Sequence, residues 1–518
     1  MGIVGRRTAS SIFYGMVGKI TSTLIAFAGS VVLARILGPD YYGLAFALIA
    51  LPQSLVSLVD LGLNGVIVRY GSRNEWDTAL SASIIRVILI IGMSMALIVF
   101  SRDIAYAFNR PYIIKYMPVV ILYFLFYSLD MLAGALVGAL GLFRIGNVTL
   151  IVKNIVRVAI AITLALLGFG AISVVWGLVI SYGFETLVLS LIAIYKLKSN
   201  VIRLLSDVKV FVRGARESLV MIAPLIANII VGSVTSPIIS IFQVRYSSNE
   251  LLGNYNAATN VASVLDGLVG VIGGGLTFGI TVSKDREIIE KAFVKGTMYS
   301  TLIISFLATG SAILANQVIA VLYGGKYVYG GLMFMLQAVA LYSVMLGQYG
   351  AFLWAIGDTK LMSLTGVLST LAWDVEAIVL ILLFGGAWGF IYAALLSAYT
   401  GGLITLILVY RVYKVLPDFM ANLRALMPSV IAGAIIYPFT LFLTPKMALT
   451  LIIPYALLFM LFTSLFLRTK EINELMRIVL TDKVLRIVLF KPLLLMLKIN
   501  TYFYNISWLQ KALYYDDK

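Results

Sequence analysis

The sequence contains no cysteine and no histidine among its 518 residues. Without cysteine there can be no disulfide and no thiol nucleophile, and without histidine there is no imidazole base. The two absences together remove the usual protein ligands of zinc. We therefore expect no metal site, no catalytic residue and no cofactor. Charged residues are also scarce, at 12% of the chain, whereas hydrophobic residues make up 61%.

This composition points to a membrane protein. The mean hydropathy is +1.02, and a soluble domain needs more polar residues than this to cover its exterior. Apolar runs of the roughly 20 residues that cross a bilayer as a helix recur along nearly the whole chain. We predict an all-α integral membrane protein with about fourteen transmembrane helices. The predicted spans are 12–37, 43–69, 79–100, 116–141, 147–168, 171–195, 218–243, 253–282, 294–322, 330–356, 361–384, 387–410, 427–443 and 448–467.

The distribution of Lys and Arg predicts the orientation of these spans. The formal net charge is +16, with 39 Lys and Arg in total. If the N-terminus is cytoplasmic, 28 of them fall on the cytoplasmic side and seven on the outer side. Cytoplasmic loops of membrane proteins carry such an excess. We therefore expect a multi-pass protein of the cytoplasmic membrane with both termini cytoplasmic, and no soluble basic face that would bind nucleic acid.

An internal repeat organises the spans into two halves. The distance from Gly141 to Gly170 is 29 residues, as is the distance from Gly357 to Gly386, and Gly43 matches Gly253. Because each repeat holds an even number of spans, the halves share one orientation. We predict two pseudo-symmetric six-helix lobes, two C-terminal helices and an amphipathic tail. The expected boundaries are 1–195 for the N-lobe, 196–217 for a basic cytoplasmic linker, 218–410 for the C-lobe, 427–467 for the two extra helices and 468–518 for the cytoplasmic tail.

The tail mixes Lys and Arg with Leu, Ile, Val and Met. Such a composition is typical of a helix that lies on the inner leaflet. The alternatives are a tail that docks onto a partner and a loosely ordered tail.

One early segment has a specific pattern. The turn after the first span reads ARILGPDYYG, from Ala34 to Gly43, and DLG follows late in the second span, from Asp60 to Gly62. With the span count, this resembles the polysaccharide-biosynthesis flippases (Wzx-type) of the multidrug/oligosaccharidyl-lipid/polysaccharide (MOP) exporter superfamily. The peptidoglycan-precursor branch of that superfamily has several Arg in spans one, two and eight. Here Lys19 is the one base well inside these spans, which disfavours that branch.

The resemblance implies a transporter and not an enzyme. Such a transporter flips a polyprenyl-phosphate- or pyrophosphate-linked oligosaccharide from the cytoplasmic to the outer leaflet by alternating access, for surface polysaccharide or glycoprotein assembly. Its partners would be the lipid-linked substrate, the bilayer, a coupling cation (Na⁺ or H⁺) and glycan-assembly enzymes. The alternative within the superfamily is a cation-coupled antiporter of drugs or other small molecules. A membrane glycosyltransferase or polymerase would need a large outer loop with paired acids, and the outer loops are short.

Basic residues inside the spans are candidates for binding the substrate headgroup. A charge near the middle of a bilayer costs about 2.5–3.5 kcal/mol, so it usually faces a partner or a hydrated cavity. Lys19, Arg86, Lys153 and Arg157 lie within predicted spans. Lys153 and Arg157 are four residues apart and share one helix face, where two cations are placed to hold a phosphate. Alternatively, neighbouring helices pair these charges, for instance Asp130 with Arg157, or Lys19 and Arg86 snorkel to the interface.

Three acidic residues inside the spans are candidates for coupling or gating: Asp60, Asp130 and Asp266. Asp60 and Asp266 occupy roughly corresponding places in spans two and eight. The resemblance implies that these two helices border a central cavity. An acid there would bind a coupling cation, gate the lobes or pair with a base of the first lobe. We expect Asp60 to face a hydrated cavity, because lipid disfavours its charge.

Overall fold

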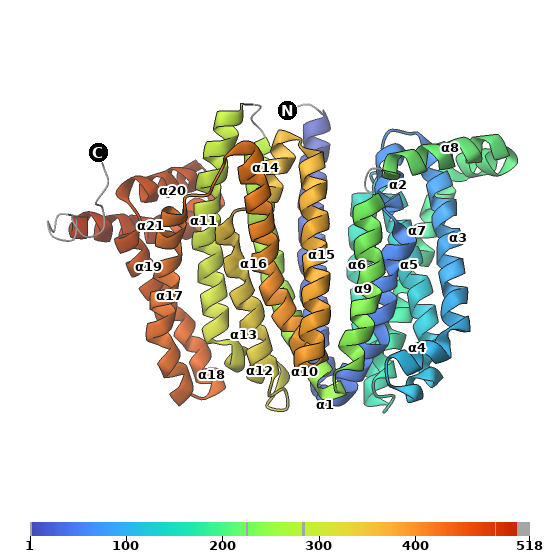
Figure 1. Ribbon diagram of the computed structural model, residues 1–518, viewed down its shortest axis with the longest axis horizontal. Helices are drawn as coiled ribbons and strands as arrows, with labels where there is room; N and C mark the ends of the chain where they lie inside the picture. Colours follow the sequence, from blue (N-terminus) through green and yellow to red (C-terminus); the bar gives the residue numbers. More distant parts are fainter. Residues whose placement is uncertain (1–2, 224–225, 282–284, 482, 505–518) are drawn as a thin grey trace. The chain divides into compact units, whose positions relative to one another are not determined.

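The computed structural model describes residues 3–223, 226–281, 285–481 and 483–504 (Figure 1). The described ranges are helical and contain no β-strand. Helices are expected in lipid, because a helix satisfies every backbone N–H and C=O within its own segment. The chain divides into two compact units, which are described separately. Unit 1 is the chain up to Val261 together with Thr370–Ala393, and unit 2 is Ala262–Ser369 together with the chain from Ala394 onward.

Unit 1 is built mainly from the first nine α-helices and one 3₁₀ helix. They are α1 (Ile3–Asp60), α2 (Leu63–Gly71), α3 (Trp76–Val99), α4 (Ser101–Ala107), the 3₁₀ helix η1 (Pro111–Tyr116), α5 (Met117–Ala139), α6 (Phe143–Leu166), α7 (Ile172–Ser206), α8 (Val208–Ile222) and α9 (Ile226–Arg245). Three longer helices each begin in one unit and end in the other. They are α10 (Asn249–Thr281), α15 (Thr359–Phe384) and α16 (Gly386–Tyr413).

Unit 2 contains the remaining helices. They are α11 (Arg286–Ile313), α12 (Ala315–Tyr323), α13 (Gly330–Ala340), η3 (Leu341–Leu346), α14 (Tyr349–Ile356), α17 (Phe419–Phe442), α18 (Pro445–Ala448), η4 (Leu449–Leu451), α19 (Ile452–Phe466), α20 (Thr469–Thr481) and α21 (Lys483–Tyr504). In the region expected to be a tail, α20 and α21 lie across the end of α17 and α19 (Figure 1). Glu474 of α20 forms an ion pair with Lys295 at 2.7 Å and accepts a hydrogen bond from Tyr299 at 3.0 Å. This part of the tail is therefore docked onto α11.

The all-α multi-pass architecture is confirmed, but the count of fourteen spans is not. Ten helices among the described residues are long and apolar enough to cross a membrane, or eleven if the bent pair Gly330–Leu346 and Tyr349–Ile356 forms one span. One reason for the lower count is that α1 covers the first expected span and most of the second. These two parts meet at Gly38, which has a φ of 71° that interrupts the helical geometry. A second reason is that α9 and α10 occupy two expected spans but are not among the ten.

Two of the glycines matched by the repeat have the same backbone conformation. Gly141, before α6, has a φ of 70°, and Gly357, before α15, has a φ of 81°. This left-handed region favours glycine, which has no Cβ to clash with the backbone. Each glycine ends one helix and starts the next, which is consistent with the repeat.

A further matched pair, Gly43 and Gly253, meets where α1 crosses α10 within unit 1. A Cβ on Gly43 would overlap the backbone at Asn249 and Gly253, and a Cβ on Gly253 would overlap the backbone of Pro39. Next to this crossing, Asn260 donates a hydrogen bond to the Tyr42 hydroxyl at 2.8 Å. Small residues at a membrane helix crossing permit this close backbone approach.

Helix α1 packs along α6 in the same direction, through small residues. Gly29 faces Val158, where a Cβ would overlap the valine side chain. Nearer the start of both helices, Asn154 donates a hydrogen bond to the Ser22 hydroxyl at 2.6 Å. These contacts between α1 and α6 fix the position of α6, which carries the candidate basic residues Lys153 and Arg157.

Candidate functional site

A buried charge cluster joins three helices of unit 1. Lys153 of α6 lies 3.1 Å from Asp130 of α5 and forms a second ion pair with Glu185 of α7. The three side chains are no more than 10% exposed. Thr149 also donates a hydrogen bond to Glu185 at 3.1 Å. We call Asp130, Lys153 and Glu185 the charge triad. Because it holds two acids and one base, its formal charge is −1 when all three are ionised.

Tyrosines extend the polar region along α5 and α7. Tyr127 and Tyr123 lie one and two turns before Asp130, and their rings stack with centroids 5.6 Å apart. Tyr182 packs edge-on against Tyr127 at 5.0 Å, and its ring lies 4.4 Å from the Lys153 ammonium group. This distance is within the range of a cation–π interaction.

A pocket of about 280 Å³ opens onto the charge triad. Its walls come from the second half of α5, the first half of α6 and α7. Gly134 and Gly138 stand one turn apart on the α5 wall, and neither would contact another atom through a Cβ. The side-chain oxygen Oδ1 of Asp130 is buried and has no hydrogen-bond partner among the described residues. The pocket therefore leads to a carboxylate with spare hydrogen-bonding capacity.

Arg157 lies one turn beyond Lys153 on α6. Its side chain is half-buried, and no acid pairs with it in the parts of the chain that the structure describes. It lies within electrostatic range of the Tyr123 and Tyr182 hydroxyl groups. Because α6 spans Phe143–Leu166, Arg157 is near the middle of a membrane-spanning helix.

A second ion pair lies where α1 gives way to α2. Asp60 is 3.2 Å from Arg86 of α3, whose side chain is fully buried, whereas the Asp60 side chain is 25% exposed. Arg86 also donates a hydrogen bond to Asn64. The residues after Asp60 are both left-handed, Leu61 with a φ of 45° and Gly62 with a φ of 80°. The DLG motif is thus a helix break.

The structure unites some of the predicted site residues and separates others. Asp130 forms its ion pair with Lys153, whereas the sequence had suggested Arg157 as one possible partner. Asp60 pairs with Arg86. Lys19 is exposed on α1 in unit 1 and has no ion pair within the described ranges. Asp266 is exposed on α10 in unit 2, also without an ion pair among the described residues.

Several contributors to the site were not selected from the sequence. Glu185 was visible as a charge inside a span, but nothing in the sequence singled it out over the other acids. Tyr123 and Tyr127 are spaced i, i+4, and Tyr182 and Glu185 are spaced i, i+3, so each pair shares a helix face. In the described ranges, no group of three or more acidic side chains gathers as a metal site.

The long apolar helices define a multi-pass membrane protein, and buried ion pairs lie inside them. Comparison with known proteins identifies the family. Residues 8–278 match the model of the family described as polysaccharide biosynthesis protein. Because this match spans more than half of the chain, the chain belongs to that family.

One characterised relative is also a polysaccharide biosynthesis protein. The chain is 26% identical over 327 residues to the succinoglycan biosynthesis transport protein ExoT of Rhizobium meliloti (strain 1021), covering 62% of this chain and 63% of ExoT. The chain thus spans less than two thirds of the length of this curated relative.

Two solved membrane-protein structures have a similar fold. The inward closed conformation of the lipid II flippase MurJ superposes with a TM-score of 0.71 and 17% identity, over 88% of this chain and 98% of MurJ. An inward-facing multidrug resistance MATE family transporter of the MOP superfamily superposes with a TM-score of 0.54 and 13% identity, over 76% of this chain and 96% of the transporter. At these identities the likeness concerns the fold alone.

Proposed function

We propose that this protein flips a polyprenyl-phosphate- or pyrophosphate-linked oligosaccharide from the cytoplasmic to the outer leaflet by alternating access. Membership of the polysaccharide biosynthesis family supports this proposal, as do the similarity to ExoT, a succinoglycan biosynthesis transport protein, and the likeness of the fold to a lipid II flippase. The product would serve the assembly of a surface polysaccharide or glycoprotein. The protein would lie in the cytoplasmic membrane with both termini cytoplasmic, and glycan-assembly enzymes would supply and consume its substrate.

The observation that carries the proposal is the position of Arg157. A guanidinium group near the middle of a membrane-spanning helix is costly, and no described acid neutralises it. Arginine binds phosphate oxygens through two parallel N–H···O hydrogen bonds. We therefore assign the headgroup phosphate to Arg157, with the exposed Lys19 as a second candidate.

Lys153 and Arg86 have a different relation to an anionic substrate. Lys153 already faces two carboxylates, so its surroundings repel a phosphate while the charge triad is intact. Arg86 is held by Asp60. These two cations would bind substrate only in a transport state in which their ion pairs open.

The charge triad is the proposed coupling element. Its net charge of −1 would be neutralised by one H⁺ or Na⁺, and the partnerless Oδ1 of Asp130 beside the pocket is the position for that cation. Coupling through Asp60 and Asp266 remains a prediction. Neutralising the triad would weaken the hold of Lys153 on its acids, which links cation binding to a change in helix packing.

The first test is a lipid analysis of the host organism. The gene is deleted, and polyprenol-linked oligosaccharide and surface glycan are both quantified. We expect lipid-linked oligosaccharide to accumulate while surface glycan falls. Unchanged levels of both, in a host without a second flippase gene, would contradict the proposal. Assays of drug sensitivity and ion flux would then test the antiporter alternative, which the MATE-like fold keeps open.

The second test concerns Arg157. The deletion strain is complemented with Arg157→Ala, with Arg157→Lys and with Arg102→Ala as a matched control on the exposed helix α4. Loss of a charge-assisted hydrogen bond costs about 1.5–3 kcal/mol, so Arg157→Ala should reduce flipping by about tenfold or more. Arg157→Lys should retain part of the activity. Full activity of Arg157→Ala at equal protein level would refute the assignment of the headgroup to this residue.

A further inference from the structure

Helix α8 lies across the end of α3 instead of running along the unit 1 bundle (Figure 1). One side of α8 makes direct contacts with α3. Glu217 accepts a hydrogen bond from Thr78 at 2.5 Å, and Ser218 donates one to the Thr78 carbonyl at 3.4 Å. Gly214 packs so closely on α3 that a Cβ would come within 2.8 Å of the Asp77 carbonyl oxygen. The orientation of α8 is therefore set by direct packing.

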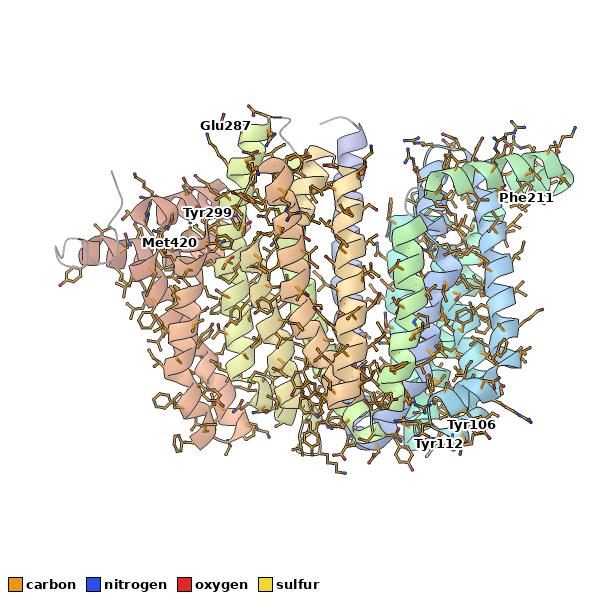
Figure 2. All side chains as sticks on the ribbon, viewed as in Figure 1. Tyr106, Tyr112, Phe211, Glu287, Tyr299 and Met420 are labelled. Atoms are coloured by element: carbon orange, nitrogen blue, oxygen red, sulfur yellow. The ribbon has the colours of Figure 1, made fainter. Side chains whose placement is uncertain are left out.

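A second side of α8 is apolar and uncovered. Val208, Val212 and Leu219 are 73%, 57% and 52% exposed. Phe211, which Figure 2 shows on α8, lines an open hollow of about 500 Å³ beside this side. Apolar area left in water costs about 25 cal/mol per Å², so this surface is unfavourable in water and favourable against hydrocarbon.

A third side of α8 is basic. Lys209, Arg213 and Arg216 are spaced i, i+4 and i+7, so they form one edge of the helix. All three are exposed, and none forms an ion pair in the described parts of the chain. The nearby acid Glu217 accepts a hydrogen bond from the neutral Thr78 hydroxyl and keeps its charge, so the three bases and this acid sum to +2. The basic edge borders the apolar side, because Arg216 also lines the hollow.

We propose that α8 is a membrane-interface helix that binds an anionic phospholipid. The acyl chains would cover the apolar side and enter the hollow, and the phosphate would contact Lys209, Arg213 and Arg216. Charge complementarity selects an anionic over a zwitterionic lipid, because the three bases outnumber the two neighbouring acids, Asp207 and Glu217. The apolar side next to a basic edge is the arrangement of helices that lie in the plane of a bilayer surface. This inference is separate from flipping, because a lipid-bound α8 fits any transporter with this fold.

The test uses the full-length protein, which has no native cysteine to be labelled in error. A bimane fluorophore is attached at Leu219→Cys, and the protein is placed in phosphatidylcholine nanodiscs that contain a minor fraction of phosphatidylglycerol. Bromine atoms, which quench bimane, are placed on the acyl chains of one lipid or the other. We expect strong quenching by both lipids, and more by brominated phosphatidylglycerol than its mole fraction predicts. A second label at Val212→Cys repeats the measurement if the first variant misfolds.

Charge variants then test the basic edge. Each basic residue near an anionic surface contributes about 1 kcal/mol, so replacing Lys209, Arg213 and Arg216 together by Gln should lower the phosphatidylglycerol preference by about a hundredfold. The control is a triple variant with the same charge loss at exposed bases of unit 2, and it should keep the preference: Lys360→Gln, Arg411→Gln and Lys498→Gln.

Three results would overturn the inference. In the first, the bimane spectrum is that of a water-exposed label and neither lipid quenches it, which would mean that α8 lies outside the membrane. In the second, quenching follows mole fraction for both lipids, so that α8 contacts lipid without selecting anionic headgroups. In the third, the unit 2 control loses the preference as fully as the α8 variant, so that the effect reports total charge.

Discussion

Replacing Lys153 by Met should destabilise the protein far more than removing either of its acidic partners. The variant leaves Asp130 and Glu185 buried together with no cation between them. Breaking a buried ion pair by removing one partner costs about 3–5 kcal/mol, because the remaining charge is uncompensated. Here two like charges remain, so we expect the upper part of that range unless one carboxyl group takes up a proton.

The single acid variants should behave differently. Glu185→Gln leaves one acid and one base, Asp130 and Lys153, which are 3.1 Å apart. Asp130→Asn leaves the pair between Lys153 and Glu185. Each should cost less than Lys153→Met, because the charge of the cluster becomes balanced. The triple neutral variant should recover much of the loss, since well-packed neutral groups often replace buried ions without a penalty.

The assay is the apparent melting midpoint of purified protein in detergent, followed by fluorescence-detected size exclusion after heating. A loss of 3–5 kcal/mol should lower the midpoint by about 5 °C or more. Lys291→Met is the matched control, because Lys291 forms an exposed ion pair with Glu287 and exposed pairs contribute little. A Lys153→Met midpoint equal to that of the parent, or a triple variant no more stable than the single one, would refute the charge argument.

Two further predictions concern unit 1 and use the same assay. Gly43→Ala should lower the midpoint by several degrees, because its Cβ would overlap the α10 backbone and overpacking costs about 1–3 kcal/mol. The control Gly92→Ala should not lower the midpoint, because a Cβ at Gly92 would contact nothing. Asp60→Asn should lower it more than Arg86→Met. The first change leaves a fully buried guanidinium without a countercharge, whereas the second leaves a carboxylate that is 25% exposed. The reverse order would show that the DLG acid is not needed to balance Arg86.

The architecture could be predicted from the sequence where a residue pattern permits only one kind of backbone structure. Apolar runs of membrane length predict helices, and these were found. Gly141 and Gly357 precede helices at matching places in the repeat, and both are left-handed, which glycine adopts without strain. The boundary of the second expected span was less accessible. It ends at Asp60, because Leu61 takes a left-handed conformation that the identity of a leucine does not suggest.

The site was only partly accessible, because ion pairing depends on helix rotation and height. The spacing of Lys153 and Arg157 places both on one face of α6, yet only Lys153 reaches Asp130. A single turn of helix raises a side chain by about 5.4 Å, which exceeds the reach of an ion pair. The choice between Lys153 and Arg157 therefore depends on how far α5 and α6 are offset along their axes. Glu185, which carries no motif, completes the charge triad through the corresponding offset between α6 and α7.

Asp60 is partly exposed, forms an ion pair and caps a helix. An acid late in a hydrophobic run suggests a residue that faces water, which stays a prediction for Asp60, whose side chain is 25% exposed. It also compensates the charge of a buried arginine, and it accepts a hydrogen bond from the Asn64 backbone N–H at 3.2 Å. That N–H lies in the first turn of α2, where helix donors have no intrahelical partner. A neutral asparagine would preserve this bond but not the countercharge. Comparing Asp60→Asn with Asp60→Ala thus separates helix capping from electrostatics, since only the alanine variant loses both.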